Sequence, residues 1–503
     1  MRNGSAEIPS SRPGPWPRHP VFYEINTRAW LWDLSQKSGA KVSLANVPAG
    51  EWDRLADLGV DVVWLMGVWE RSPAGVSIAN QNGELAAEFQ RVFPDFQAGD
   101  NIGSAYCVRR YEVDPNLGGP HGLAVARGEL AARGIRLMLD FVPNHVAHDH
   151  PWVMGHPGFF VQGSEEDAAG DPEAFATVGG RVFACGRDPY FPAWRDVLQL
   201  NVFSDGLRAA AVRTLNRIAS QCDAVRCDMA MLVLNQVFER TWGARVGPKP
   251  ALDYWQEVIP PVRRAHPGFR FVAEAYWGLE PELLRQGFDF CYDKPLYDCL
   301  LSGPAEAVRA RLLGDPANGL QRLRFIENHD EQRAAHAFDE AKAFAAAVAM
   351  LTLPGGRLIH DGQGEGHRTR VPVFLQRRPR EQVDRNCAEF YHRLLRALRQ
   401  EIFLEGEWSL CACEGWPDNA SNRNLLVWGW ILGEVRALIV VNYSESRSQG
   451  RIFLPWSGLA SRSWDIKDSM TGEIFRRDGS EMATVGVFVD LGPWCYHFWM
   501  IAT

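Results

Sequence analysis

The chain has 503 residues, of which 46% are hydrophobic and 23% are charged, and its formal net charge is −8. This composition is typical of a folded globular protein, and it excludes a long disordered tract. The negative charge argues against a nucleic-acid partner, because contacts with the phosphate backbone need a basic surface. Single cores rarely grow beyond about 300 residues, so the length predicts more than one domain.

The first 20 residues combine charged side chains with a proline-rich stretch and contain no apolar run. They lack the apolar core of a secretory signal, and no later segment reaches the roughly 18 apolar residues that a membrane helix needs. The ten cysteines are spread over the chain, and several lie in apolar runs, which predicts reduced thiols rather than a disulfide framework. We therefore expect a cytoplasmic protein without a membrane partner.

From about residue 21 to residue 400, short apolar runs alternate with helical patterns, which is typical of repeated βα units around a parallel sheet. Apolar residues at helical spacing over residues 207–218, after the candidate caps Ser204 and Asp205, predict a helix that packs on the outside of this sheet. Eight apolar runs predict the strands of a closed (β/α)8 barrel: Val21–Ile25, Val60–Leu65, Ile135–Asp140, Cys222–Cys227, Phe269–Ala273, Phe288–Tyr292, Leu323–Ile326 and Arg357–His360.

The third and fourth predicted strands are separated by residues 141–221, which are too many for an ordinary loop. We expect the irregular part of this stretch, residues 146–204, to form a lid-like inserted subdomain. After about residue 405, alternating strands replace the helical period and predict a C-terminal β-sandwich. The predicted domains are the barrel (1–145 and 205–404), the insertion (146–204) and the sandwich (405–503).

Four segments place acidic residues and histidines at the carboxyl ends of predicted strands, where barrel enzymes keep their active sites. They run from Asp140 to His145, from Val225 to Asp228, from Ala273 to Trp277 and from Phe325 to Asp330. With two outlying segments, Ser104 to Asp114 and Leu353 to Gln363, they resemble the ordered signature regions of the α-amylase superfamily, glycoside hydrolase family 13. The resemblance covers about residues 20–400. It implies a (β/α)8 barrel and a retaining enzyme that acts on α-glucans or maltooligosaccharides.

Cleavage of a glycosidic bond needs one carboxylate at the anomeric carbon and one protonated carboxyl at the leaving oxygen, roughly 5–5.5 Å apart in a retaining enzyme. Asp228 is the predicted nucleophile; it lies two residues after Arg226, so strand alternation directs both side chains toward the barrel mouth. Glu274 ends an apolar run, where poor hydration raises the pKa of a carboxyl, and it is the predicted proton donor. The resemblance implies that Asp330 is the third catalytic carboxylate and binds sugar hydroxyls.

The resemblance also implies the substrate-binding residues. His145 and His329 are expected to donate hydrogen bonds to the sugar as neutral imidazoles, and Tyr106 to stack on it. The predicted binding set also includes Arg226, Asp140 and Trp277. Asp140 is expected to act mainly as a framework residue at the barrel mouth.

No metal and no other cofactor is predicted. Asn144 matches a position that binds calcium in some family members, but the sequence does not identify carboxylate partners for an ion. His145, His148 and His150 could be interpreted as a metal cluster, although their spacing does not place two of them four residues apart on a helix. The C-terminal tryptophans are interpreted as sandwich core rather than as a carbohydrate-binding face.

Two alternatives to hydrolysis stay open. Starch-cleaving members of the family carry a Lys-His pair shortly after the nucleophile, where this chain has Met231 and Leu232. The side of the site that receives the acceptor is therefore expected to be apolar. Together with Tyr276 and Trp277, this surface is expected to exclude water or to stack a second sugar. The segment from His150 to Trp194 also resembles enzymes that transfer maltosyl units to α-glucan, so a glucanotransferase is the first alternative. A non-catalytic scaffold is the second, and it is less favoured because all three carboxylates are present.

Overall fold

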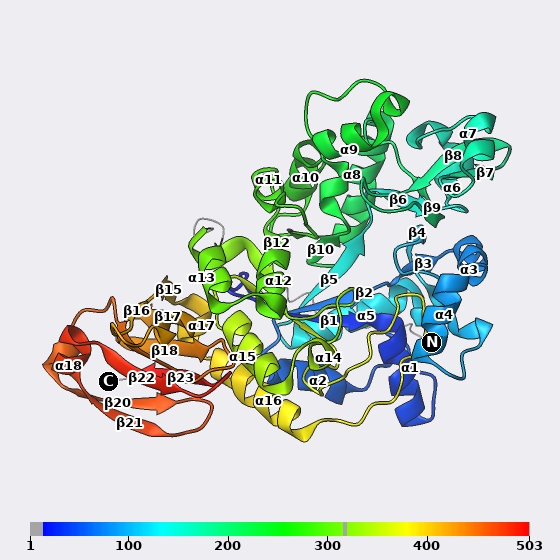
Figure 1. Ribbon diagram of the computed structural model, residues 1–503. Coiled ribbons are helices and arrows are strands. Elements are labelled where there is room, and N and C mark those ends of the chain that lie inside the picture. The colour runs from blue at the N-terminus through cyan, green and yellow to red at the C-terminus, as the bar shows by residue number, and fades with distance from the viewer. Residues whose placement is uncertain (1–13, 315–318, 502–503) are drawn as a thin grey trace.

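The computed structural model describes residues 14–314 and 319–501. Eight parallel strands close into a barrel in the order β1-β14-β13-β12-β11-β10-β5-β2 (Figure 1). All eight strands predicted from the sequence are present, with ends that differ by a few residues. Their bounds are β1 (Val21–Asn26), β2 (Val62–Met66), β5 (Arg136–Phe141), β10 (Ala224–Cys227), β11 (Arg270–Ala273), β12 (Phe290–Tyr292), β13 (Arg322–Arg324) and β14 (Gly356–His360).

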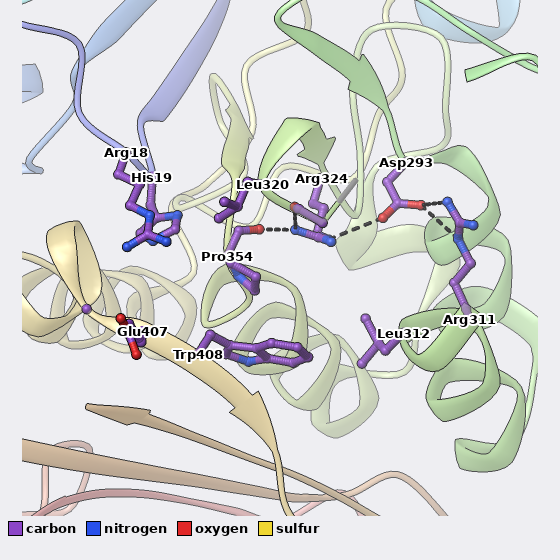
Figure 2. Close-up of a pocket in the computed structure, with 12 residues that line it drawn as sticks. Arg18, His19, Asp293, Arg311, Leu312, Leu320, Arg324, Pro354, Glu407 and Trp408 are labelled. Atoms are coloured by element: carbon purple, nitrogen blue, oxygen red, sulfur yellow. Dashed lines mark hydrogen bonds and ion pairs between the residues drawn. The ribbon is translucent and has the colours of Figure 1, made fainter. Parts of the chain in front are cut away.

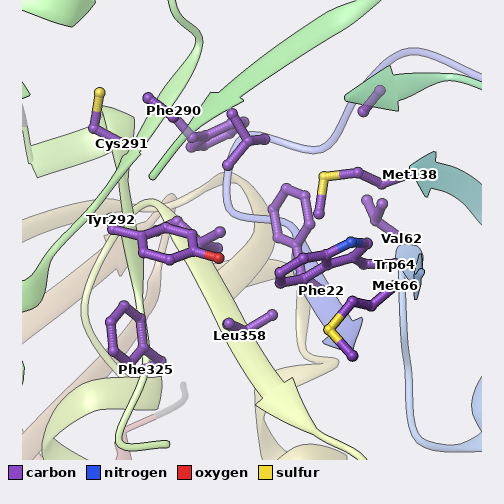
Figure 3. Close-up of a cluster of buried hydrophobic side chains, with 14 of the residues drawn as sticks. Phe22, Val62, Trp64, Met66, Met138, Phe290, Cys291, Tyr292, Phe325 and Leu358 are labelled. Carbon is purple, nitrogen blue, oxygen red and sulfur yellow. The ribbon is translucent and has the colours of Figure 1, made fainter. Parts of the chain in front are cut away.

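The barrel strands are mainly apolar because both of their faces are covered. Every residue of β2 and of β5 is buried. Large side chains fill the interior, where the ring of Phe22 meets that of Phe290 edge to face at 5.6 Å (Figure 3). The barrel is therefore a packed core, and its chemistry is confined to the strand ends.

Helices follow the strands and cover the barrel. The helix predicted over residues 207–218 is confirmed as part of α8, and the hydroxyl of Ser204 accepts a hydrogen bond from the backbone nitrogen of Leu207 as its N-cap. The larger helices of this part of the chain are α1 (Thr27–Ser38), α2 (Ala49–Asp57), α5 (Gly119–Ala132), α8 (Asp205–Ala219), α9 (Asn235–Trp242), α10 (Tyr254–Ala265), α11 (Glu280–Arg285), α12 (Lys294–Ser302), α13 (Ala305–Gly314), α15 (Glu340–Leu351), α16 (Arg385–Leu398) and α17 (Glu401–Glu405).

Two excursions rise from the carboxyl ends of the strands. The first follows β2 and holds the two-stranded ribbon β3 (Trp69–Arg71) and β4 (Val108–Val113), with helices α3 (Pro73–Asn80) and α4 (Gly83–Val92) between them. The second follows β5 and holds a four-stranded antiparallel sheet in the order β6-β9-β8-β7. The elements of the second excursion are β6 (His145–Ala147), α6 (Pro151–Gly155), α7 (Glu165–Gly170), β7 (Phe175–Val178), β8 (Arg181–Gly186) and β9 (Trp194–Gln199).

The expectation that residues 146–204 are irregular is wrong, because they form a sheet whose apolar side chains join the buried cluster of the barrel. Phe160 and Phe183 are buried there and meet edge to face at 5.3 Å. The strands are short and interrupted by Gly and Pro, so their periodicity is weak in the sequence.

The C-terminal part is a β-sandwich, as predicted. A six-stranded antiparallel sheet has the order β15-β17-β18-β23-β20-β21, and a three-stranded sheet has the order β16-β19-β22. Apolar residues of both sheets, such as Val440 and Val489, share one buried cluster. The strands are β15 (Glu407–Leu410), β16 (Ala412–Glu414), β17 (Leu425–Leu432), β18 (Val435–Asn442), β19 (Ser448–Phe453), β20 (Ser463–Asp468), β21 (Ile474–Asp478), β22 (Val487–Leu491) and β23 (Tyr496–Ile501), with helix α18 (Gly479–Thr484).

Three of the C-terminal tryptophans lie in the core. Trp499 belongs to the cluster between the two sheets. Trp428 and Trp430 face the barrel, and their indole nitrogens donate to the hydroxyl and the carbonyl of Thr352 at 3.1 and 2.9 Å. All three are at most 1% exposed, but only Trp499 lies in the predicted sandwich core, because Trp428 and Trp430 join the buried cluster of the barrel.

The division of the chain into three domains at residues 146, 205 and 405 stays a prediction. Within the described residues, no helix is both long enough and apolar enough to cross a membrane.

Candidate active site

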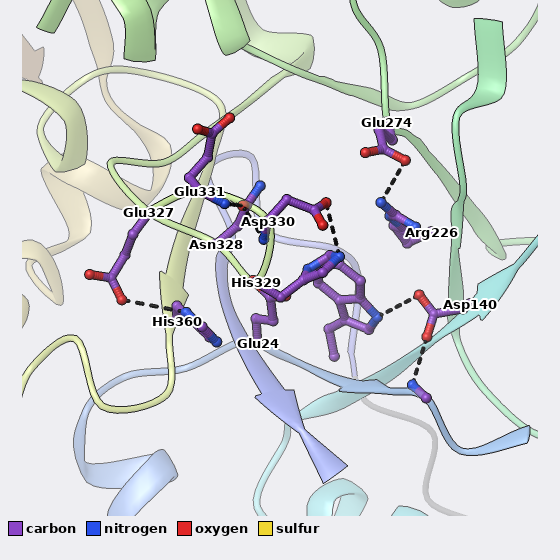
Figure 4. Close-up of polar contacts among 12 residues, drawn as sticks. Glu24, Asp140, Arg226, Glu274, Glu327, Asn328, His329, Asp330, Glu331 and His360 are labelled. Atoms are coloured by element: carbon purple, nitrogen blue, oxygen red, sulfur yellow. Dashed lines mark hydrogen bonds and ion pairs between the residues drawn. The ribbon is translucent and has the colours of Figure 1, made fainter. Parts of the chain in front are cut away.

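The acidic side chains singled out in the sequence meet at one end of the barrel. Asp228 directly follows β10 and Glu274 directly follows β11, while Asp330 lies six residues beyond the end of β13. Because all three strands run parallel in one closed sheet, their carboxyl ends open on the same face. Figure 4 shows Glu274, Arg226 and Asp330 converging there.

Arg226 connects two of these carboxylates. Its Nη1 lies 2.6 Å from Oδ1 of Asp228, and its Nη2 lies 2.6 Å from Oε2 of Glu274. The side chain is fully buried, and its guanidinium lies over the rings of Trp64 and Tyr106 at 5.3 and 5.0 Å. The sequence predicted the contact with Asp228, while the contact with Glu274 comes from the neighbouring strand. One cation therefore fixes two acidic groups relative to each other.

Glu274 is only 3% exposed and accepts two further hydrogen bonds. The backbone nitrogen of Met229 donates to its Oε2 at 2.6 Å, and the hydroxyl of Tyr276 donates to its Oε1 at 2.8 Å. Burial raises the pKa of Glu274 to about 7, against the lowering effect of Arg226. Glu274 can therefore hold a proton near neutral pH, which is the direction that the apolar run before it predicted.

The turn after Asp228 is strained in order to present this backbone donor. Met229 has a φ of 41°, in the left-handed region that is unfavourable for a side chain of this type. Such strain persists only where the surrounding structure fixes it, and it is concentrated at functional sites.

Asp330 reaches toward the open face, with 46% of its side chain exposed, and it pairs with His329. Nε2 of His329 lies 3.1 Å from Oδ2 of Asp330 and 2.7 Å from the hydroxyl of Tyr106. Nδ1 of His329 lies 2.5 Å from Oε1 of Glu24. Burial lowers the pKa of His329, but Asp330 and Glu24 outweigh it and raise that pKa well above the usual value. Burial likewise opposes the charge on Asp330, yet His329 lowers the pKa of Asp330 to about 2.

The expectation of a neutral imidazole at His329 is therefore wrong, because two carboxylates contact its two nitrogens. His145 is different. It lies in β6, is 5% exposed and packs edge to face on Trp194 at 5.3 Å, and burial lowers its pKa. His145 is accordingly neutral, as expected for a hydrogen-bond donor without charge.

Tyr106 lies between Arg226 and His329 and stacks on the imidazole at 5.4 Å. Asp140 lies below this layer and is 2% exposed. The indole nitrogen of Trp64 donates to its Oδ1 at 3.1 Å, and the backbone nitrogen of Gly67 donates to its Oδ2 at 3.0 Å. Both oxygens of Asp140 thus bind the protein itself, while its framework role and its part in the binding set stay predictions.

Trp277 forms an aromatic surface beside the proton donor. It is 40% exposed with a φ of 62°, and its ring meets that of Tyr190 edge to face at 4.9 Å. Tyr190 is 53% exposed and comes from the insertion between β8 and β9, and the guanidinium of Arg240 in α9 lies over it at 5.2 Å. With Phe191, these are three of the exposed aromatic side chains in the described part of the chain.

The expectation that Met231 and Leu232 form an apolar acceptor surface is wrong. The short 3-10 helix Ala230–Val233 turns both side chains into the core, where they are 0% and 3% exposed. The exposed apolar surface near Glu274 comes instead from Tyr190 and Trp277, which are 87 positions apart and were not paired from the sequence.

Within residues 14–314 and 319–501, no group of three or more His, Cys, Asp or Glu side chains is arranged to hold a metal ion. The amide of Asn144 is occupied by Gln199, whose Nε2 donates to the Asn144 Oδ1 at 2.9 Å. The absence of a metal stays a prediction.

A separate cavity of about 320 Å³ lies where the barrel meets β15 (Figure 2). Asp293 lines it and pairs with Arg311 at 2.8 Å and with Arg324 at 3.2 Å, while Trp408 of β15 covers one side. None of the three catalytic candidates lines this cavity. It is a junction between structural parts and is not the candidate active site.

Two residues that the sequence did not predict contact residues of the candidate site, namely His329 and Glu274. Glu24 is the one acidic residue within the apolar strand β1, and a charged residue in a buried strand is the signal that could have identified it. Tyr276 was noted only for the acceptor side, yet its hydroxyl binds Glu274. Neither contact follows from spacing along the chain.

Comparison with known proteins places this geometry in context. No family model matches the chain. It is 24% identical over 367 residues to α-amylase MalA of Haloarcula japonica, covering 71% of this chain and 45% of that protein. It is 19% identical over 393 residues to α-amylase 3 of Dictyoglomus thermophilum, covering 74% and 68% of the two chains. Among solved structures, the maltogenic α-amylase AmyB of Thermotoga neapolitana superposes with a TM-score of 0.69 at 17% identity, covering 97% and 99%.

The fold, the ordered motifs and these relatives agree. The chain is therefore similar in sequence to α-amylases and shares the fold of solved α-amylase structures. It spans slightly less than half the length of MalA, 45%, and about two thirds of the length of the Dictyoglomus protein.

Proposed function

We propose that this chain is a retaining α-glycoside hydrolase that acts on α-glucans or maltooligosaccharides through a covalent glycosyl-enzyme intermediate. The observation that supports this most directly is the shared guanidinium of Arg226, which holds Asp228 and Glu274 side by side at 2.6 Å each. A retaining enzyme needs its two carboxyls close enough to reach the same anomeric carbon and its leaving oxygen.

In the first step, a carboxylate oxygen of Asp228 attacks the anomeric carbon. The bond from that carbon to the leaving oxygen breaks, and this oxygen takes the proton of Glu274. Asp228 starts as the ion, stabilised by Arg226. Glu274 starts protonated, because burial raises its pKa to about 7.

In the second step, Glu274 has become a carboxylate and takes a proton from the incoming water. The water oxygen bonds to the anomeric carbon, and the ester bond to Asp228 breaks. Both carboxyls return to their starting protonation states. Three donors stabilise the intermediate charge on Glu274: Arg226, the backbone nitrogen of Met229 and the hydroxyl of Tyr276.

Asp330 binds hydroxyl groups of the sugar in this proposal. It is charged at neutral pH and exposed toward the open face, so its free lone pairs accept hydrogen bonds from two vicinal hydroxyls. Tyr106 and His145 complete the binding set, and the reaction needs neither a metal nor another cofactor.

The acceptor side supports transfer as a second candidate function. Tyr190 and Trp277 form an exposed aromatic surface next to Glu274, and such a surface suits the apolar face of a pyranose. A sugar bound there competes with water for the intermediate, and its hydroxyl gives a longer glucan. A scaffold without activity is disfavoured, because each carboxylate has the partners that its catalytic task requires.

The test is an assay of the purified chain with an aryl α-glucoside and with maltooligosaccharides, together with the variants Asp228→Ala and Glu274→Gln. Glucose or maltose with retained α-configuration is expected for hydrolysis, and products longer than the substrate are expected for transfer. A wild-type protein without turnover on any α-glucoside would reject both candidates.

We further propose that the protein works in a reducing compartment such as the cytoplasm. All ten cysteines are free thiols, and eight of them carry a pKa that burial raises to about 11 or higher, or well above the usual value, so they stay protonated.

A further inference from the structure

Glu24 lies in the interior of the barrel, and its carboxylate contacts His329 of the candidate active site. It belongs to β1, where it pairs in register with Trp64 of β2 and His360 of β14, and it is fully buried. Its Oε1 contacts Nδ1 of His329 at 2.5 Å. Its Oε2 has no hydrogen-bond partner among the described residues. An unpaired buried carboxylate is very costly, so His329 is the contact that makes this residue tolerable.

The contact continues from His329 to the open face. The opposite ring nitrogen, Nε2, binds the exposed carboxylate of Asp330 at 3.1 Å and the hydroxyl of Tyr106 at 2.7 Å. When Glu24 binds Nδ1–H, the ring orientation is fixed, and Nε2 faces both the hydroxyl of Tyr106 and the carboxylate of Asp330. An uninterrupted series of contacts therefore joins β1 to the carboxylate that we assign to sugar binding.

We propose that Glu24 is a positioning residue that acts through His329, holding it as a cation with both N–H groups directed so that Asp330 stays charged and correctly oriented for the substrate. The inference rests on the proposed function of the site. It assigns a task to a buried acid that has no place in the reaction steps themselves.

The groups around His329 on every side fit this task. Glu24 and Asp330 supply the negative charge, and the edge-to-face ring of Trp64 at 5.4 Å contributes no formal charge. Burial alone lowers the pKa of an imidazole, so the cation depends on both carboxylates. Other titratable groups whose charge acts on His329 or on its partners include Tyr106, Asp140, Arg226, Glu274, Tyr276, Tyr292, His360 and Arg370.

The alternative explanation is that the Glu24–His329 ion pair only stabilises the fold. Two variants of Glu24 distinguish this structural role from the positioning role. Glu24→Gln keeps the size and a hydrogen-bond acceptor but removes the charge. Glu24→Asp keeps the charge but shortens the reach by one methylene. Glu327→Gln is the matched control, because Glu327 is an equally buried acid that pairs with Arg333 at 3.2 Å rather than with His329.

The first measurement does not depend on activity. The full-length protein is labelled with ¹³C-histidine, the His329 signal is identified by its loss in His329→Asn, and its NMR shift is followed from pH 5.5 to 9. The signal is expected to stay that of the cation in the wild type and in Glu327→Gln, and to titrate within this range in Glu24→Gln. Identical titration of His329 in Glu24→Gln and wild type would overturn the proposal.

The second measurement uses hydrolysis of an aryl α-glucoside as a function of pH. Glu24→Gln is expected to lose roughly ten- to a hundredfold in kcat/KM, and to lose more as pH rises through the new pKa of His329. Glu24→Asp should retain more activity than Glu24→Gln if charge is what matters. A kcat/KM profile for Glu24→Gln that is parallel to the wild type at all pH values would contradict the positioning role. If the wild type has no activity at all, the proposed function fails, while the NMR titration still decides whether Glu24 governs His329.

Discussion

The hydroxyl of Tyr276 donates a hydrogen bond of 2.8 Å to Oε1 of Glu274, two residues earlier in the chain. The other carboxyl oxygen of Glu274, Oε2, contacts Arg226 and the backbone nitrogen of Met229. All three donors favour the charged carboxylate, and burial favours the neutral acid. The balance leaves the pKa of Glu274 at about 7, so this phenol helps to set the pH range in which the acid works.

The wild-type rate is expected to fall as pH rises through about 7, because the first step needs protonated Glu274. Tyr276→Phe removes a hydrogen-bond donor to the charged carboxylate, so it should raise the pKa of Glu274. The alkaline limb of the profile, where kcat/KM falls with rising pH, should then shift to higher pH by about one unit. The pH profile of aryl α-glucoside hydrolysis checks the shift.

Tyr391→Phe is the control for this change. Tyr391 is also buried, but its hydroxyl accepts a hydrogen bond from Gln363 and does not contact Glu274. Its alkaline limb should match the wild type. A Tyr276→Phe limb that stays in place, or moves downward, would show that the phenol does not stabilise the carboxylate.

Glu274→Gln cannot protonate the leaving oxygen, so its effect must depend on the leaving group. With a maltooligosaccharide, a loss of about 10²- to 10⁴-fold in kcat is expected, which is the usual contribution of general acid catalysis. With a dinitrophenyl α-glucoside, whose leaving group needs no proton, the loss should be much smaller. Steady-state kinetics on the two substrates measure the difference, and equal losses on both would argue against Glu274 as the acid.

Trp277→Ala and Tyr190→Ala remove the exposed aromatic surface next to Glu274. If this surface stacks an acceptor sugar, each variant should reduce the ratio of transfer to hydrolysis products by roughly two- to tenfold, in line with about 0.5–1.5 kcal/mol for one aromatic contact. Chromatography of the products at high maltooligosaccharide concentration gives this ratio. Phe488→Ala serves as the control, since Phe488 is 42% exposed in the C-terminal sandwich. An unchanged ratio in both aromatic variants would remove the support for a stacked acceptor.

Trp430→Phe tests how the sandwich is attached to the barrel. The variant removes a hydrogen bond of 2.9 Å and leaves the buried carbonyl of Thr352 without this donor. Trp499→Phe is a matched control, because the Trp499 indole nitrogen is buried without a partner among the described residues. The free energy of unfolding in urea should fall by about 1–2 kcal/mol more for Trp430→Phe than for Trp499→Phe. Equal losses would mean that only packing matters at this junction.

The sequence by itself predicted the barrel and the order of its acids. The eight apolar runs are local signals, because a strand covered on both faces is apolar along its whole length. Asp228 and Glu274 each follow such an apolar run, whereas Asp330 was identified from the resemblance to the family. The weakly periodic sheet at residues 146–204 was missed, because short strands broken by turns carry little local pattern.

The tertiary structure alone decided which of these side chains share partners. Arg226 reaches Glu274 on the neighbouring strand, and Glu24 reaches His329 from a position 305 residues earlier, which reverses the expected neutrality of that imidazole. Tyr190 meets Trp277 only because the insertion folds over the barrel. Charge and hydrogen bonding act through space within a few ångströms, so they depend on the closure of the barrel, whereas the apolar pattern of a strand is set by its own residues.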